Sequence, residues 1–226
     1  MAVLAFDIYG TLIDPISIQA HLGPLFGDAA REASELWRQK QLEYSFRRAI
    51  MQRYVTFPVC TEQALEYVGR RFDVELTNLH KRELLDHYLR LPTYPDVARG
   101  LELVEQDGHT LIAFSNGTEE AVRGLLDNAG VLHRFRTIVS VDDVRTFKPS
   151  PLVYEYLADR CGAPRSALWM ISSNPFDVIG AKACGLKAAW LQRDPRNPFD
   201  TWEFSPDVTV HSLEELAEMA AFESDG

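Results

Sequence analysis

Short apolar runs alternate with helical patterns along most of the chain. The runs at 3–6 and 168–171, and the run at 110–114 after its opening Thr110, are continuously apolar, as strands buried on both faces usually are. Weaker runs follow at 187–191 and 207–210. Between these runs apolar residues recur every three or four positions, which predicts helices. Strands that alternate with helices favour a mostly parallel sheet with helices packed on both faces.

The segment between the first two runs differs from the rest, because it holds several helical patterns and no convincing strand. One apolar stripe at helical spacing consists of Leu65, Val68 and Phe72. A second stripe consists of Leu84, Leu85, Tyr88 and Leu89, and a third, with one polar member, of Leu36, Trp37, Lys40 and Tyr44.

A proline-containing segment, 91–95, is a linker signal at the end of this helical region. We therefore expect an α/β core domain over residues 1–14 and 93–226, and a helical cap domain over residues 15–92 that is inserted after the first strand. Ligands of such folds bind at the carboxyl ends of the strands. Because the insertion leaves the core from that edge, the cap is placed to act as a lid.

Composition and charge are those of an acidic globular protein. Hydrophobic residues make up 46% of the 226 residues and charged residues 25%, which excludes a disordered or low-complexity chain. The net charge of −10 repels phosphate backbones and anionic lipids, so we expect neither nucleic acid nor a membrane as partner. Three widely spaced cysteines argue against a disulfide framework or a zinc cluster, and the opening residues lack the basic region of a signal peptide. We therefore expect a cytoplasmic protein.

Polar residues stand where the three strongest strands end. Asp7 follows the first run, Ser115 and Asn116 the second and the segment 172–177 the third, while Lys148 lies between the second and third. Because the carboxyl ends of parallel strands meet at one edge of a sheet, we expect these side chains to converge. A desolvated carboxylate on a strand end suits a nucleophile, and a helix start suits an anion. Each residue also has a plainer reading: Asp7 as a turn cap, Ser115 as a helix cap, and Lys148 as a solvated surface lysine.

Four motifs resemble those of one known family. They are FDIYGTL at 6–12, LWRQKQLEY at 36–44, FSNG at 114–117, and Lys148 followed by SSNPFD at 172–177. The first resembles the first motif of the haloacid dehalogenase (HAD) superfamily, and together they are similar to its L-2-haloacid dehalogenase (type II) branch. The resemblance implies a Rossmann-like, HAD-like parallel-sheet core with a helical cap inserted after the first strand.

Two positions favour the dehalogenase branch over the phosphatases that make up most of the superfamily. Phosphatases carry a second aspartate two residues after the nucleophile, whereas here that residue is Tyr9, which is neutral at pH 7 and a poor acid there. Phosphatases also hold Mg²⁺ with acidic residues of the last motif, where the segment 172–177 has a single carboxylate. We therefore expect no metal and no cofactor.

The resemblance implies a role for each matching residue around the nucleophile. Asp7 would attack C2 of the substrate, displace halide with inversion and form an ester, and Thr11 would orient it. Lys148 would keep Asp7 ionised and tie it to Asp177, which would activate the water that hydrolyses the ester. The residues implied to orient that water are Ser172 and Asn174.

Other matching residues are implied to bind the substrate and the leaving halide. Ser115 and Asn116 would hold the substrate carboxylate, and Arg38 from the cap would receive the halide together with Asn116 and the apolar Phe176. Without the resemblance, Arg38 reads as a surface arginine that pairs with Glu35 or with a nearby aspartate. The remaining implied site residues are Tyr154, a hydrogen-bond donor beside the site, and Tyr9, in the substrate pocket.

The activity that the resemblance implies is that of an (S)-2-haloacid dehalogenase, which hydrolyses short-chain 2-haloalkanoic acids to 2-hydroxy acids. Two alternatives stay open, namely a Mg²⁺-dependent small-molecule phosphatase and a non-catalytic member of the superfamily. The implied partners are the small haloacid, the halide and a second copy of the chain in a homodimer. Phe176 stands where family members often have Trp, which changes the pocket volume and hence the preferred substrate size.

Overall fold

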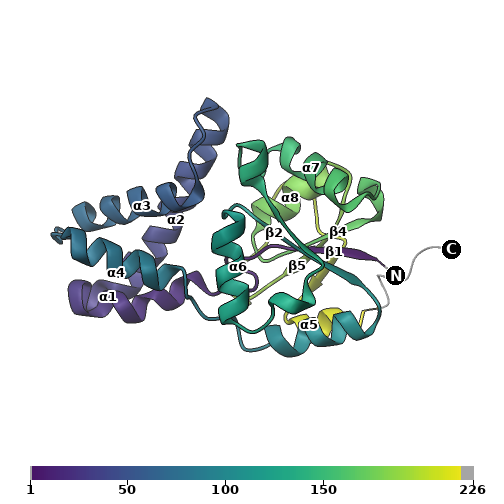
Figure 1. Ribbon diagram of the computed structural model, residues 1–226, viewed down its shortest axis with the longest axis horizontal. Coiled ribbons are helices and arrows are strands. Elements are labelled where there is room, and N and C mark those ends of the chain that lie inside the picture. Colours follow the sequence, from purple (N-terminus) through teal and green to yellow (C-terminus); the bar gives the residue numbers. More distant parts are fainter. Residues whose placement is uncertain (1, 220–226) are drawn as a thin grey trace.

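The computed structural model describes residues 2–219. The strands of this part of the chain form one six-stranded sheet. The strands lie in the order β3-β2-β1-β4-β5-β6, and every neighbouring pair is parallel (Figure 1). This confirms the predicted α/β fold with a parallel-sheet core. The strands are Val3–Phe6 (β1), Thr110–Ser115 (β2), Thr137–Ser140 (β3), Leu168–Ser172 (β4), Lys187–Leu191 (β5) and Val208–Val210 (β6).

Strand β3 has no counterpart among the runs predicted from the sequence. It is a four-residue strand at the edge of the sheet, where it pairs with β2. The 3₁₀ turn Val141–Val144, which carries two aspartates, follows it at once. The apolar run is therefore too short to be recognised by its pattern alone.

Helices cover the sheet on both sides. Figure 1 shows α7 (Pro151–Cys161) and α8 (Pro175–Ala183) on one side, and α5 (Val97–Gln106) and α9 (Leu213–Ala217) on the other. Helix α6 (Glu119–Asn128) connects β2 to β3. The alternation of strands and helices expected from the sequence is therefore present.

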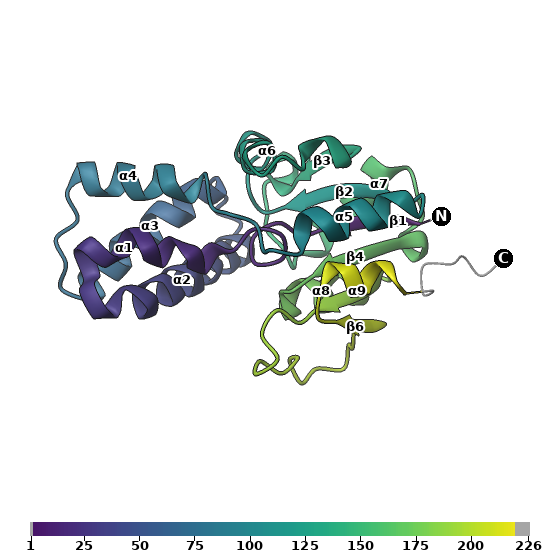
Figure 2. The same cartoon turned by 90° about the horizontal axis from the view of Figure 1, so that it is seen from below.

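The segment 15–92 is helical, as expected, and gathers beyond the carboxyl ends of the strands (Figures 1 and 2). The division into two domains at these residues stays a prediction. Within residues 2–219 no helix combines the length and the apolar character that a membrane crossing requires. The α-helices of this segment are Gln19–Phe26 (α1), Ala30–Met51 (α2), Phe57–Arg71 (α3) and Asn78–Tyr88 (α4).

The buried face of α2 is partly polar. Trp37 Nε1 donates to the Thr61 carbonyl at 2.8 Å, and Gln41 Nε2 donates to Thr61 Oγ1 at 2.6 Å. Because these groups are hydrogen-bonded, their burial is tolerated. Of the predicted stripe, Trp37 is fully buried and Leu36 and Tyr44 are half-buried against the core, whereas the polar Lys40 is half-buried. The buried face of α2 thus includes the predicted Trp37 and extends over the polar Gln41 and Ser45, which its apolar residues do not indicate.

Candidate active site

The strand order reverses between β1 and β4, which are neighbours in the middle of the sheet. β1 pairs with β2 on one side and with β4 on the other, where Phe6 lies opposite Ile171. In open parallel sheets, ligands bind outside the carboxyl ends of the strands at such a point. Asp7 directly follows β1 and the segment 172–177 ends β4 and opens α8, so both predicted motifs meet here.

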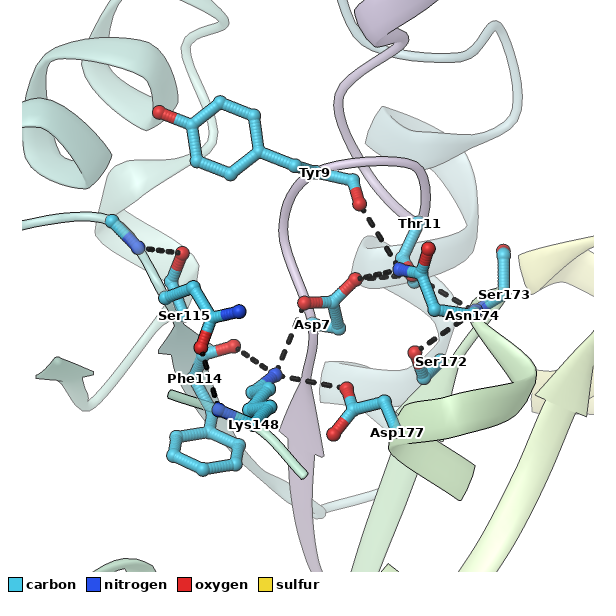
Figure 3. Close-up of polar contacts among 12 residues, drawn as sticks. Asp7, Tyr9, Thr11, Phe114, Ser115, Lys148, Ser172, Ser173, Asn174 and Asp177 are labelled. Carbon is cyan, nitrogen blue, oxygen red and sulfur yellow. Dashed lines mark hydrogen bonds and ion pairs between the residues drawn. The ribbon is translucent and has the colours of Figure 1, made fainter. Parts of the chain in front are cut away.

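Asp7 is held in a fixed orientation by three side chains (Figure 3). Its Oδ1 accepts a hydrogen bond from Lys148 Nζ at 3.0 Å, and its Oδ2 accepts from Thr11 Oγ1 and Asn174 Nδ2, both at 2.8 Å. Its backbone N–H donates to the Ile171 carbonyl at 2.9 Å, which ties the residue to β4. One carboxylate oxygen, Oδ1, therefore carries a single hydrogen bond and keeps lone-pair capacity.

Lys148 is buried between two carboxylates (Figure 3). Its Nζ donates to Asp7 Oδ1 at 3.0 Å, to Asp177 Oδ2 at 2.9 Å and to the Phe114 carbonyl at 2.9 Å. Three such bonds use all the protons of an ammonium group, so the side chain is a cation. The Phe114 ring supports it, with Nζ 4.1 Å from the ring centroid. The reading of Lys148 as a surface lysine is wrong, because the residue is 1% exposed.

Asp177 is fully buried on α8 and has a partner for each oxygen. Oδ2 accepts from Lys148, and Oδ1 accepts from the Tyr154 hydroxyl at 2.7 Å. Burial raises the pKa of Asp177 above its usual range, and the nearby charge of Asp7 adds to that effect, while Lys148 and Tyr154 oppose it. The two carboxylates thus share one ammonium but have different surroundings.

The turn after β2 offers donors next to the nucleophile. Ser115 Oγ accepts from the Gly117 N–H at 3.0 Å, which leaves the hydroxyl proton free to donate elsewhere. Asn116 Oδ1 accepts from the Lys148 N–H at 3.0 Å, so its NH₂ group is the end that remains to donate. Both predicted carboxylate-binding residues therefore keep a donor; Ser115 ends β2, the strand next to β1, and Asn116 directly follows it.

Arg38 reaches the core from helix α2. Its Nη2 donates to the Tyr9 carbonyl at 2.8 Å, and its Nη1 donates to Gln41 Oε1 at 2.8 Å. The surface pairing with Glu35 is absent, since Glu35 instead accepts from Arg31 at 3.0 Å. The predicted halide-binding cation thus bonds the backbone carbonyl of Tyr9, the second residue after the nucleophile.

Tyr9 contributes its backbone carbonyl to the polar network and its ring to the cap. The carbonyl also accepts from Asn174 Nδ2 at 3.1 Å. The ring turns away from Asp7 in Figure 3 and packs against Phe57 and Tyr88, with centroids 5.7 and 5.9 Å apart. Burial raises the pKa of the Tyr9 hydroxyl far above its usual range. The side chain therefore stays neutral and does not serve as an acid in neutral solution.

The segment from the end of β4 into the start of α8 carries the other predicted site residues. Ser172 Oγ accepts from the Asn174 N–H at 3.1 Å, which fixes the start of the helix. Asn174 bonds Asp7 rather than Asp177, so its side chain serves the nucleophile directly. Phe176 packs edge-to-face on Phe46 of α2, with ring centroids 4.9 Å apart, and so spans the boundary between core and cap.

Three residues in this network were not among those predicted. The Phe114 carbonyl binds Lys148, Gln41 holds Arg38, and Trp190 Nε1 donates to the Ser173 carbonyl at 3.2 Å. Gln41 lies within the motif LWRQKQLEY at 36–44, and this motif is the sequence signal that could have identified it. A carbonyl carries no sequence signal at all, because every residue has one.

The donor set at the centre of the site does not suit a divalent cation. Asp7 and Asp177 are the carboxylates that would bridge a metal, and both already bind the Lys148 ammonium. A second cation between them would face that charge at short range. Among residues 2–219, no group of three or more His, Cys, Asp and Glu side chains is placed to hold a metal ion.

Comparison with known proteins agrees with this geometry. Residues 1–185 match the family model of haloacid dehalogenase-like hydrolases. The chain belongs to this family. Within the family it falls in the L-2-haloacid dehalogenase branch, as its relatives indicate. The chain is 37% identical over 221 residues to "(S)-2-haloacid dehalogenase 2" of Pseudomonas sp. (strain CBS-3), an alignment that covers 98% of this chain and 96% of the relative.

Two further relatives of this HAD-like hydrolase are informative. It is 36% identical to "Haloacetate dehalogenase H-2" of Moraxella sp. (strain B), over 96% of this chain and 97% of that one. A solved structure of the L-2-haloacid dehalogenase from Xanthobacter autotrophicus, with chloropropionic acid covalently bound, superposes with a TM-score of 0.90 at 30% identity. That match covers 96% of this chain and 97% of the other.

Proposed function

We propose that this HAD-like hydrolase is an (S)-2-haloacid dehalogenase that converts short-chain 2-haloalkanoic acids to 2-hydroxy acids. The observation that carries the proposal is Lys148, whose ammonium joins Asp7 to Asp177 at the reversal point of the sheet. This arrangement provides an ionised nucleophile, a second carboxylate beside it and a counter-charge for both, with no need for a metal.

In the first step Asp7 attacks the substrate. Oδ1, which carries one hydrogen bond where Oδ2 carries two, forms a bond to C2, while the carbon–halogen bond breaks and the halide leaves with the electron pair. Attack from the side opposite the halide inverts C2. The product is an ester between Asp7 and the substrate.

Hydrogen-bond donors at the edge of the site bind the two anionic groups of the reaction, the substrate carboxylate and the leaving halide. The Ser115 hydroxyl and the Asn116 amide bind the substrate carboxylate, and the Arg38 guanidinium stabilises the departing halide. Charge that develops on the halide is thus met by a cation already fixed in place. Phe176 and the cap rings supply an apolar wall for the alkyl group.

In the second step water hydrolyses the ester. Asp177 takes a proton from a water molecule, whose oxygen attacks the carbonyl carbon of the Asp7 ester. The bond from that carbon to Oδ1 breaks, and Oδ1 leaves with the substrate as the new hydroxyl, which receives the proton from Asp177. The water oxygen stays on Asp7, which ionises again beside Lys148.

Phosphatase chemistry fits this site less well. A phosphatase needs an acid two residues after the nucleophile to protonate the leaving group, and the Tyr9 ring is turned away and has a raised pKa. It also needs Mg²⁺, whereas the two carboxylates at the centre of this site, Asp7 and Asp177, already bind the Lys148 ammonium. Halide departure needs neither a proton nor a metal.

The proposal is tested by halide release from L- and D-2-chloropropionate in EDTA, with Asp7→Asn as control. We expect release from the L enantiomer, with 2-hydroxypropionate as co-product, and none from the variant. Hydrolysis of p-nitrophenyl phosphate with Mg²⁺ is assayed in parallel. Mg²⁺-dependent phosphate release without halide release would replace the proposal with the phosphatase reading.

A further inference from the structure

The chain crosses between the core and the helical segment 15–92 twice, and the two crossings are paired. The Asp14 N–H donates to the Pro92 carbonyl at 2.9 Å, and the Tyr94 N–H donates to the Leu12 carbonyl at 3.0 Å. An antiparallel bridge between Ile13 and Thr93 lies between these bonds. The crossings thus form a short two-stranded hinge.

Arg193, in the loop after β5, binds both crossings at once. On the outgoing crossing, its Nη2 and Nε donate to the Thr11 carbonyl at 2.7 and 3.2 Å. On the returning crossing, its Nη1 lies 2.7 Å from each oxygen of Asp96, and its guanidinium carbon lies 4.4 Å from the centroid of the Tyr94 ring. The side chain is 13% exposed, so these charge-assisted bonds are largely shielded from water.

Thr11, whose backbone carbonyl accepts hydrogen bonds from Arg193, also orients the nucleophile. Thr11 Oγ1 donates to Asp7 Oδ2 at 2.8 Å and accepts from the Ser173 N–H at 2.9 Å (Figure 3). Arg193 makes no hydrogen bond within residues 2–219 to Asp7 or to any donor proposed to bind substrate. Its influence on the reaction must therefore pass through Thr11 and the hinge.

We propose that Arg193 is a positioning residue: it locks the two-stranded hinge and fixes the Thr11 backbone so that the Thr11 hydroxyl aims Asp7 at the substrate. The catalytic half of this proposal rests on the proposed function, whereas the hinge half does not. A displacement of the nucleophile by about 1 Å costs roughly a hundredfold in rate, so a loosened Thr11 has a measurable effect.

Asp96 is also part of the structural frame, because its Oδ2 accepts from the Leu213 N–H at 2.8 Å. If Arg193 had a purely structural role, its substitution would lower the free energy of unfolding and would slow the enzyme only because part of it unfolds. A role through Thr11 makes a different prediction, because the effects of the two residues on the rate would then not multiply.

The first test is a double-mutant cycle on single-turnover halide release with Arg193→Gln, Thr11→Val and the double variant. We expect Arg193→Gln to lower the rate constant about 10- to 100-fold with KM changed less than about threefold. The double variant should match Thr11→Val within about threefold. Effects that multiply would overturn the proposal, as would a rate constant for Arg193→Gln equal to that of the wild type. Arg196→Gln is the matched control, since Arg196 lies in the same loop, is largely exposed and pairs only with Asp194 within residues 2–219.

The second test needs no enzymatic activity. Hydrogen exchange of the Asp14 and Tyr94 amides should be about tenfold faster in Arg193→Gln than in Arg196→Gln, because these amides form the hinge bonds. Equal protection in the two variants would overturn the hinge half. Arg193→Lys, which keeps a charge for Asp96 but not the paired donors for Thr11, gives the same readout if Arg193→Gln does not fold. Absence of halide release from the wild type would instead contradict the proposed function, and the exchange result would still decide the hinge.

Discussion

The hydroxyl of Tyr154 donates to Asp177 Oδ1 at 2.7 Å, and both side chains are fully buried. The same hydroxyl lies 3.2 Å from the Asp177 backbone carbonyl, so the tyrosine holds the whole residue in place. A hydrogen bond to the ionised carboxylate favours its charged form, which is the form that accepts a proton from water. Tyr154 therefore acts on the second step of the proposed reaction, because Asp7 makes its bonds elsewhere.

We predict that Tyr154→Phe slows ester hydrolysis and leaves ester formation nearly unchanged. Loss of a hydrogen bond to a charged group costs about 1.5–3 kcal/mol, which corresponds to roughly a 10- to 100-fold slower second step. Rapid-quench measurement of halide should then show a burst followed by a slow steady state. Tyr156→Phe is the control, since that tyrosine is on the same helix but bonds the more distant Asp143. A slower burst in Tyr154→Phe would contradict the assignment.

The raised pKa of Asp177 predicts how the rate of ester hydrolysis, the second step, falls at low pH. An ordinary aspartate titrates near about pH 3.9, and burial moves Asp177 above that value. Because the ionised form takes the proton from water, ester hydrolysis should increase as pH rises through the raised pKa. Tyr154→Phe should move the midpoint to still higher pH, since the lost bond favours the ionised form. A midpoint at or below the ordinary value, measured by single-turnover kinetics, would contradict this account.

Lys148→Met should abolish halide release and destabilise the fold. The variant leaves two buried carboxylates without their counter-charge, and such a loss typically costs about 3–5 kcal/mol in the free energy of unfolding. Urea denaturation measures this value. For comparison, Lys182→Met removes a more exposed ion pair with Asp207 and should cost about 0–1 kcal/mol. Similar costs for the two variants would show that Lys148 is not the central counter-charge.

Phe176→Trp should shift the preference toward smaller substrates. Phe176 packs on Phe46 across the boundary between core and cap, so a larger ring there takes space from the alkyl group. One methylene group is worth about 1–3 kcal/mol of discrimination, so the ratio of kcat/KM for 2-chlorobutyrate over chloroacetate should fall about tenfold. An unchanged ratio would mean that Phe176 does not limit substrate size.

The fold could be predicted where elements are long or fully buried. Strands β1, β2 and β4 carry continuous apolar runs, and the helical pattern separates the segment 15–92 from the rest. Strand β3 was missed because only Ile138 and Val139 of its four residues are apolar, whereas all four residues of β1 are. The polar part of the buried face of α2 was missed because Gln41 is a polar residue whose partner, Thr61, lies on another helix.

The site could be predicted in part, for a topological reason. Asp7 and the segment 172–177 follow strands that a parallel sheet must bring to one edge. By residue type alone Lys148 reads as a surface residue; the family resemblance implies instead that it belongs to the site, and its three buried acceptors agree with that. Arg193 could not be found, since its partners are a backbone carbonyl and an aspartate far away along the chain. The homodimer, the cytoplasmic location and the individual residue roles stay predictions.

The most direct test of the central claim is one turnover, with enzyme in excess over L-2-chloropropionate, in water enriched in the heavy oxygen isotope. If Asp7 forms an ester that water then cleaves at its carbonyl carbon, the heavy oxygen enters the Asp7 side chain, and the 2-hydroxypropionate carries an unlabelled oxygen. Mass spectrometry of the peptide that contains Asp7 and of the product measures both. Heavy oxygen in the first-turnover product, with Asp7 unlabelled, would mean that water attacks C2 directly, which contradicts the account.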